Sequence, residues 1–326
     1  MKRSAFLKLA GGAALARPLP AHAQKTAHAV IGLLTTATPD ASVLGAIHKG
    51  LGERGYVEGR NVAIVARSAE GRFDRLPALA AELVERKVSV ILGIGGPVPA
   101  RSAKALTTTI PIVFAYGGDP VIDGLVAGIG RPGGNVTGAT FIGTALSGKR
   151  LQLLRELLPR MADVALLINP KSTLADGQIK DAEAACRTLG LRLSILNVGS
   201  AGEIDDAFET MSKAKTDALM IGTDPTLGLV YSKQIIAQAA RRRIPAIYPT
   251  RLETNDGGLM SYGASFPEAV HKAAIYVGRI LDGERPANLP VLEPTTFETV
   301  INVRAAKALG LVVPPSLLAI ADDVIE

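Results

Sequence analysis

The feature that most constrains the fold is an alternation, from residue 29 onward, of short β-branched runs with longer amphipathic stretches. This alternation is typical of βαβ units, which place helices over a parallel sheet. In the first half we predict strands at 30–36, 62–66, 88–94, 110–115 and 136–141 and helices at 39–55, 73–87 and 99–108. The first half therefore predicts one α/β lobe.

The second half repeats this scheme. We predict strands at 164–168, 191–198, 218–222, 244–248 and 259–262 and helices at 175–189, 203–214 and 227–241. Residues 90–97 match residues 218–225, and residues 109–114 match residues 243–248, so that in both halves a Gly/Pro-type loop follows the third strand and an Ile-Pro pair opens the fourth. Two similar lobes explain this better than one long sheet.

The C-terminal part breaks the symmetry with a further helix at 266–281, a polar turn at 282–290, a strand at 297–303 and a short helix at 305–309. Because a helix and a strand remain after two complete lobes, we expect the chain to cross back between the lobes and to form a hinge there. The predicted N-terminal lobe comprises residues 24–143 and 266–288, and the predicted C-terminal lobe comprises residues 144–265 and 289–326.

The first 23 residues have the pattern of a secretory signal peptide. Lys2 and Arg3 precede an apolar stretch at 6–15, and Ala21-His22-Ala23 forms an A-x-A cleavage signal. The apolar stretch is shorter than the roughly 20 residues that a permanent membrane anchor needs. We therefore expect cleavage after Ala23 and a periplasmic protein that is not embedded in the membrane. Residues 3–8 resemble a twin-arginine signal with Ser4 in place of the second arginine, which leaves both export routes open.

Charge and composition argue against a nucleic-acid partner. The net charge is +6, but without the four basic residues of the leader 32 basic and 30 acidic residues remain, a net charge of +2. A nucleic-acid-binding protein normally keeps a concentrated basic face. The apolar fraction of 48% is ordinary for a folded protein, and the single cysteine, Cys186, permits no intramolecular disulfide.

Polar and small residues gather where the predicted strands end. In open α/β sheets, ligands bind beyond the carboxyl ends of the strands. The candidate ligand-binding residues are Thr35, Thr36, Gly95, Gly96, Pro97, Tyr116, Gly118, Asp119 and Thr140 in the first half and Asn169, Asp224, Tyr248 and Tyr262 in the second. Hydroxyls, amides, carboxylates and glycines suit hydrogen bonding to a small polar molecule.

Each candidate also has a purely structural explanation. The threonines and Asn169 could satisfy turns and helix caps, the two tyrosines of the second half could pack within a lobe, and Asp119 and Asp224, which precede prolines, could be N-caps. As ligand contacts, the two carboxylates would receive an ammonium group.

The chain has no constellation typical of an enzyme. Beyond the leader its histidines are His28, His48 and His271, and none forms a pair with metal-ligand spacing. No nucleophile elbow occurs, and the loop at 93–98 lacks the third glycine of a dinucleotide-binding motif. We therefore expect no catalytic residues, no metal and no cofactor. An acid/base role for Asp119 and Asp224 is the less economical alternative.

Several motifs are distributed over essentially the whole chain: GYVEGRNV at 55–62, GRFDRLPALA at 71–80, IPIVF at 110–114, GGDPV at 117–121, RPGGNVTG at 131–138, KRLQLLRELLP at 149–159, GGLMSYG at 257–263 and AKALGLVVPPSLL at 306–318. Together these motifs resemble one bacterial family, the ABC-transporter substrate-binding proteins that include tryptophan- and tyrosine-binding members.

The resemblance implies a type I periplasmic-binding fold, in which two Rossmann-like lobes joined by a three-crossover hinge hold a ligand in the cleft between them. It also implies delivery of an amino acid or related compound to an ABC permease driven by a separate ATPase, by a monomer without a cofactor. The residues implied to grip the zwitterion are Thr36, Gly96, Asp119 and Thr140 in the first lobe and Asn169, Asp224 and Tyr262 in the second. A protein that presents its solute to a membrane receptor is the alternative, and an exported hydrolase is the third.

Overall fold

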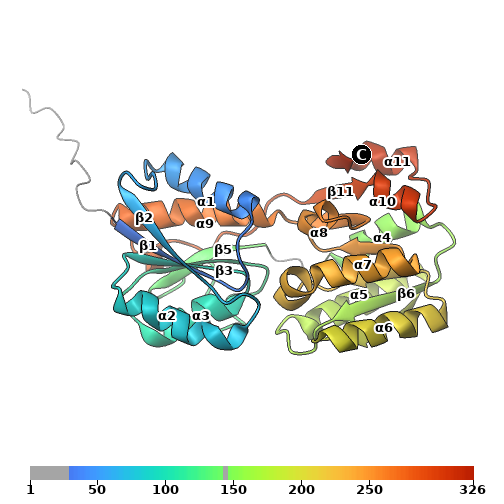
Figure 1. The fold of residues 1–326 in the computed structure, drawn as a ribbon, viewed down its shortest axis with the longest axis horizontal. Helices are drawn as coiled ribbons and strands as arrows, with labels where there is room; N and C mark the ends of the chain where they lie inside the picture. Colours follow the sequence, from blue (N-terminus) through green and yellow to red (C-terminus); the bar gives the residue numbers. More distant parts are fainter. Residues whose placement is uncertain (1–28, 142–145) are drawn as a thin grey trace, which may run out of the picture.

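The computed structural model describes residues 29–141 and 146–326, which form two α/β lobes side by side (Figure 1). The predicted signal peptide and its cleavage point lie outside the described residues. Within the described part of the chain, no helix combines the length and the apolar character needed to cross a membrane.

The first lobe contains a five-stranded parallel sheet with the order β2-β1-β3-β4-β5. Its strands are β1 (Ala29–Thr35), β2 (Val62–Ser68), β3 (Val90–Ile94), β4 (Ile112–Tyr116) and β5 (Val136–Thr140). Its helices are α1 (Ala41–Glu53), the 3-10 turn η1 (Phe73–Arg75), α2 (Leu76–Glu85), α3 (Pro97–Leu106), α9 (Phe266–Leu281) and the 3-10 turn η3 (Pro286–Asn288).

Two helical layers cover the first sheet. Helices α1 and α9 lie together on one face, and α2 and α3 lie on the other (Figure 1). Helix α1 begins where the Asp40 carboxylate accepts a hydrogen bond from the Val43 N–H (2.8 Å). It can approach α9 closely because Gly50 has no side chain: a Cβ there would lie 2.4 Å from the His271 carbonyl oxygen.

The second lobe contains a seven-stranded sheet with the order β12-β11-β10-β9-β8-β6-β7, which is parallel except where β10 meets β11. Its strands are β6 (Asp163–Ile168), β7 (Arg192–Asn197), β8 (Ala218–Ile221), β9 (Ala246–Tyr248), β10 (Met260–Gly263), β11 (Glu298–Asn302) and β12 (Asp323–Ile325). Its helices are α4 (Ser147–Leu157), α5 (Ala175–Leu189), α6 (Ala201–Ala214), the π-helical turn η2 (Thr226–Val230), α7 (Ser232–Arg242), α8 (Arg251–Asn255), α10 (Val303–Ala308) and α11 (Pro315–Ile320).

The chain passes between the lobes three times: from β5 to α4, from β10 to α9, and from η3 to β11. Helix α9 returns to the first lobe because Val270, Ala273 and Val277 are buried in its core. These crossings and the two parallel sheets confirm the predicted type I fold.

Residues 289–292 also contact the first lobe, although we expected the boundary after residue 288. The Leu292 N–H donates to the Gly138 carbonyl oxygen (2.9 Å), and the Thr140 N–H donates to the Leu292 carbonyl oxygen (2.8 Å). Leu289 and Val291 are buried in the two cores of that lobe. These contacts favour placing the last crossing at 293–297.

Most predicted elements occur within a few residues of the expected positions, but α4, α8, α11 and β12 were not predicted. The buried face of α4 includes Ser147 and Arg150, which interrupt the apolar periodicity that signals a helix. The predicted helix at 227–241 is divided into η2 and α7.

Candidate functional site

A cleft between the lobes contains three adjoining pockets. The large pocket has a cavity volume of about 480 Å³, the narrow pocket about 50 Å³ and the lateral pocket about 250 Å³. The large and narrow pockets share Gly95, Gly228, Leu229, Leu252 and Phe266. The narrow and lateral pockets share Gly117, Asp224 and Pro225. Residues from both lobes line all three pockets, so the cleft is continuous.

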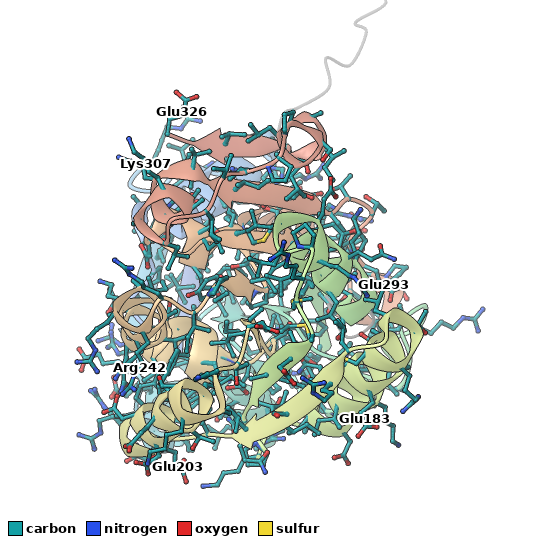
Figure 2. All side chains as sticks on the ribbon, turned by 90° about the vertical axis from the view of Figure 1, so that its right-hand side faces the viewer. Glu183, Glu203, Arg242, Glu293, Lys307 and Glu326 are labelled. Carbon is teal, nitrogen blue, oxygen red and sulfur yellow. The ribbon has the colours of Figure 1, made fainter. Side chains whose placement is uncertain are left out.

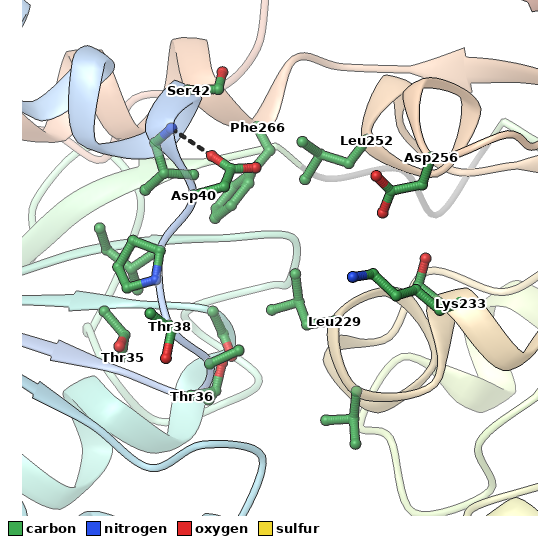
Figure 3. Close-up of a pocket in the computed structure, with 18 of the residues that line it drawn as sticks. Thr35, Thr36, Thr38, Asp40, Ser42, Leu229, Lys233, Leu252, Asp256 and Phe266 are labelled. Carbon is green, nitrogen blue, oxygen red and sulfur yellow. Dashed lines mark hydrogen bonds between the residues drawn. The ribbon is translucent and has the colours of Figure 1, made fainter.

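The large pocket lies between the loop after β1 and the helices η2, α7 and α8 (Figure 3). Its first-lobe wall carries hydroxyl groups and one carboxylate, from Thr35, Thr36, Thr38, Asp40 and Ser42. Its second-lobe wall carries Leu229, Lys233, Leu252 and Asp256. Figure 3 shows the Lys233 side chain reaching into the opening, and no carboxylate among the described residues lies within ion-pair distance of it. Its ammonium group is therefore available to an anionic group.

The narrow pocket is apolar on its first-lobe side. Phe141 and Phe266 lie with ring centroids 5.1 Å apart. Beside them Gly96 adopts a φ of 118°, and a Cβ there would lie 2.9 Å from Cγ of Pro225 in the opposite lobe. The absence of a side chain at Gly96 therefore lets the two lobes approach.

The lateral pocket contains a hydrogen bond between the lobes that the sequence did not predict. Asp123 is 6% exposed and accepts from the Tyr116 hydroxyl (2.8 Å) and, across the cleft, from the Thr173 hydroxyl (2.6 Å). Burial, together with the Asp123 charge, raises the pKa of Tyr116, so that its hydroxyl stays a donor. The predicted residues that line this pocket are Pro97, Tyr116, Gly118, Asn169 and Asp224.

The predicted threonines mainly hold loops. The Thr36 hydroxyl donates to the Gly95 carbonyl oxygen (2.8 Å), and the Thr140 hydroxyl donates to the Gly118 carbonyl oxygen (2.8 Å). Each hydroxyl has used its hydrogen and can only accept from a ligand. Thr36 lines the large pocket, whereas Thr140 lines none of the three.

The two predicted aspartates both cap turns, but they differ in position. Oδ1 of Asp119 accepts from the N–H groups of Val121 (2.8 Å) and Ile122 (3.1 Å), and Asp119 lines none of the three pockets. Asp224 is 8% exposed and lines the narrow and lateral pockets. Its Oδ1 accepts from the Asn169 amide (3.1 Å) and from the N–H groups of residues 226 and 227.

The two tyrosines predicted in the second half pack within their lobe. Tyr248 is 2% exposed and belongs to the core between the sheet and helices α6 and α7. Tyr262 stacks on Phe297 with a centroid distance of 6.1 Å. Neither lines the three pockets between the lobes, which agrees with the packing alternative.

A buried carboxylate, Glu253, lies in the wall of the narrow pocket and was not predicted. Glu253 is 3% exposed, and its Oε2 accepts from the Thr250 hydroxyl (2.6 Å). Burial raises the pKa of Glu253 to about 7, while the hydrogen bond from Thr250 and the positive charge of Arg150 act in the opposite direction. Residues 250–253 have the sequence pattern of a capping box, which indicates the start of a helix. The sequence does not indicate that the Glu253 side chain is buried.

The two histidines that the structure describes, His48 and His271, line none of the three pockets. His48 on α1 contacts Glu58 (2.9 Å), and His271 on α9 contacts Glu53 (2.9 Å). Among residues 29–141 and 146–326, no group of three or more His, Cys, Asp or Glu side chains is arranged to hold a metal ion.

Known proteins share both the sequence and this two-lobed architecture. Residues 29–325 match the family described as ABC transporter substrate binding protein. A tyrosine-binding protein of Clostridioides difficile (strain R20291) is 26% identical over 264 residues, which cover 81% of this chain and 75% of the relative.

Two solved structures have a TM-score of 0.82 and 25% identity to this chain. One is a conserved domain protein from Vibrio cholerae, with 91% of this chain and 99% of that chain covered. The other is an ABC domain in complex with L-Trp from Streptococcus pneumonia, with 92% and 100% covered. The family match over nearly the whole described chain, on a fold that these structures share, shows that the chain belongs to the ABC transporter substrate-binding protein family.

Proposed function

We propose that the chain is the extracytoplasmic solute-binding component of an ABC importer and that it captures an amino acid, or an amino-acid-like aromatic compound, in the cleft. The observation that carries the proposal is the distribution of groups along the cleft. The narrow pocket, which has an aromatic first-lobe wall and a polar second-lobe wall, lies between two larger pockets with polar linings, and both lobes contribute to every pocket.

This arrangement suits a small zwitterion with an apolar side chain. In the large pocket, Lys233 offers a counter-charge for a carboxylate, and Phe266, together with Leu229 and Leu252, offers an apolar surface to a ring. The tyrosine-binding relative and the structure with bound L-Trp support the same ligand class. A pocket of some hundreds of Å³ is also the size that ligand sites of this kind have.

Binding would favour closure of the lobes. A ligand that contacts both lobes makes its full set of contacts only when they approach, so it shifts the population toward the closed form. The closed form would then dock on a membrane permease, whose separate ATPase drives import. The protein itself would act as a monomer, without a cofactor, in the periplasm.

The proposed ligand class can be tested by identifying the bound molecule. Native mass spectrometry of the protein purified from its host, followed by calorimetric titration with L-tryptophan, L-tyrosine and L-phenylalanine, should show one bound molecule of this class per chain. Binding of a sugar or a simple carboxylate, with no heat from any of the three amino acids, would contradict the proposed ligand class.

Export can be tested separately. The mature protein should be recovered from the periplasmic fraction with Gln24 as its first residue. Recovery with Met1 retained, or only from membranes, would contradict the proposed location.

A further inference from the structure

The second-lobe wall of the narrow pocket contains a hydroxyl group without a partner. Thr223 is 7% exposed, and its Oγ1 forms no hydrogen bond with the described residues. Its backbone is held on both sides by Gln178, which accepts from the Thr223 N–H (2.6 Å) and donates to the Thr223 carbonyl oxygen (3.1 Å). A buried hydroxyl without a partner is unfavourable, so a hydroxyl in a pocket wall gains stability if a ligand bound there supplies the missing partner.

Glu253 lies in the same wall, and only one of its carboxylate oxygens is hydrogen-bonded to a side chain. Oε2 receives the Thr250 hydroxyl. Oε1 lies against the π-helical turn η2, since a Cβ added at Gly228 would be 3.1 Å from it. No side chain of the described residues donates a hydrogen bond to Oε1. Backbone N–H groups of residues 250 and 253 also interact with this carboxylate, but each carboxylate oxygen has two lone pairs, so Oε1 can still accept from a ligand.

No cationic side chain among the described residues forms an ion pair with Glu253. Arg150 from α4 acts on it electrostatically, but donates its hydrogen bonds to the carbonyl oxygens of Tyr262 (2.9 Å) and Pro249 (3.4 Å). Tyr248 from β9 stays protonated because burial and Glu253 raise its pKa. Asp224 adds negative charge to the same pocket, and Asp181 acts on Arg150.

The size of the narrow pocket limits what can enter. A volume of about 50 Å³ accommodates one or two groups the size of a water molecule, but not an aromatic ring. Among the described residues, the opposite wall, with Phe141 and Phe266, offers no side-chain acceptor. The pocket continues into the large pocket, which has room for the rest of a ligand.

We propose that the narrow pocket is an ammonium subsite, in which the Glu253 carboxylate is the counter-ion and the Thr223 hydroxyl is a further acceptor. The body of the ligand then lies in the large pocket. This inference rests on the proposed function and names the group that selects amine-bearing ligands. Asp224 is held by its capping bonds and contributes charge rather than the main contact.

The subsite predicts a specific pH dependence. In the empty protein the pKa of Glu253 is raised to about 7 by burial, so the carboxyl is mostly protonated at pH 6 and mostly ionised at pH 8. A ligand ammonium group stays charged over this range and binds the ionised form. The affinity for L-tryptophan should therefore rise about tenfold from pH 6 to pH 8, and Glu253→Gln should remove this dependence.

The test compares L-tryptophan with indole-3-propionate, which lacks the ammonium group, by calorimetric titration at pH 6 and pH 8. We expect Glu253→Gln to weaken L-tryptophan binding at least tenfold at pH 8 and to leave indole-3-propionate binding within about twofold. Glu203→Gln is the matched control, because Glu203 is also the glutamate of a capping box and lies on the outer surface of the second lobe (Figure 2).

Thr223→Val provides a second variant if Glu253→Gln folds poorly. Because the Thr223 hydroxyl has no partner in the empty protein, its removal should not lower the melting temperature, but it should weaken L-tryptophan binding threefold to tenfold. Equal binding of L-tryptophan by the wild type and both variants would overturn the subsite and leave the proposed function intact. Failure of the wild type to bind any aromatic amino acid would overturn both.

Discussion

The two lobes present corresponding loops to the cleft, and these loops differ in chemistry. After β3 the first lobe has Gly95-Gly96-Pro97, and after β8 the second lobe has Thr223-Asp224-Pro225. Both loops begin at the carboxyl end of a parallel strand, and they meet where Gly96 approaches Pro225. At these two loops, the first lobe provides space and the second lobe provides polar groups.

This difference extends through the narrow pocket. In the narrow pocket the first lobe contributes glycines at positive φ and two phenylalanines, whereas the second contributes Asp224 and Glu253. In the large and lateral pockets the first lobe also contributes carboxylates, Asp40 and Asp123. At the narrow pocket, two lobes of the same plan therefore divide the work, so that one sets how closely the cleft can close and the other sets which group of a ligand is held.

The largest loss of affinity for L-tryptophan should follow when Gly96 is given a side chain. Its φ of 118° and ψ of 176° are accessible essentially only to glycine, and a Cβ would meet Pro225 at 2.9 Å. Gly96→Ala should hold the lobes apart and, by removing the second lobe's contacts, weaken L-tryptophan binding about 100-fold in a calorimetric titration.

Gly124→Ala is the control for Gly96→Ala. Gly124 also has a positive φ, 68°, but a Cβ there would have no heavy atom within 4 Å. This variant should lose some stability and keep its affinity. Normal binding by Gly96→Ala would show that the close approach of the two loops is unnecessary.

Substitutions of Asp224 in the second lobe and of Asp119 in the first should have different effects on affinity. Asp224→Asn keeps an oxygen for the capping bonds but removes a charge from the cleft, so it should weaken L-tryptophan binding about tenfold with little change in melting temperature. Asp224→Ala should weaken binding further and also lower the free energy of unfolding by about 0.5–2 kcal/mol, because the cap is lost.

Asp119→Ala provides the counterpart in the first lobe. It removes the cap of the turn that follows β4, so the melting temperature should fall, but the affinity should not change because Asp119 lines none of the three pockets. Equal losses of affinity in Asp119→Ala and Asp224→Asn would contradict the division of roles between the lobes.

The smallest loss of affinity should follow from removing the hydrogen bond across the lateral pocket. Thr173→Val removes the donor to Asp123 and makes the closed form less favourable, which should weaken binding about threefold to tenfold. Thr188→Val is the control, because the Thr188 hydroxyl donates to the Ala184 carbonyl oxygen within α5. An unchanged affinity in Thr173→Val would mean that this bond does not favour closure.

The fold could be predicted because its signals are local. β-Branched runs that alternate with amphipathic stretches show the order of strands and helices, and the surplus helix at 266–281 indicated the return to the first lobe. Helix α4 was missed because its buried face includes Arg150, whose guanidinium donates to the carbonyl oxygens of Tyr262 and Pro249, both distant in sequence.

The candidate site was predicted only in part, because some of its residues are brought together by contacts distant in sequence. Strand ends indicated Thr36, Gly95 and Asp224, and the structure places these residues in the walls of the cleft. They also indicated Tyr248, which is buried within its lobe. Glu253 and Lys233 lie on helices of the second lobe rather than at strand ends, and they line the cleft because these helices face the first lobe. The sequence pattern within one lobe does not show which of its helices face the other lobe.

Small-angle X-ray scattering with and without saturating L-tryptophan shows whether the two lobes close on one ligand held between them. We expect a smaller radius of gyration with L-tryptophan than without it, and no such decrease for Gly96→Ala. Superimposable wild-type curves, recorded under conditions where calorimetry shows L-tryptophan to be bound, would contradict this closure.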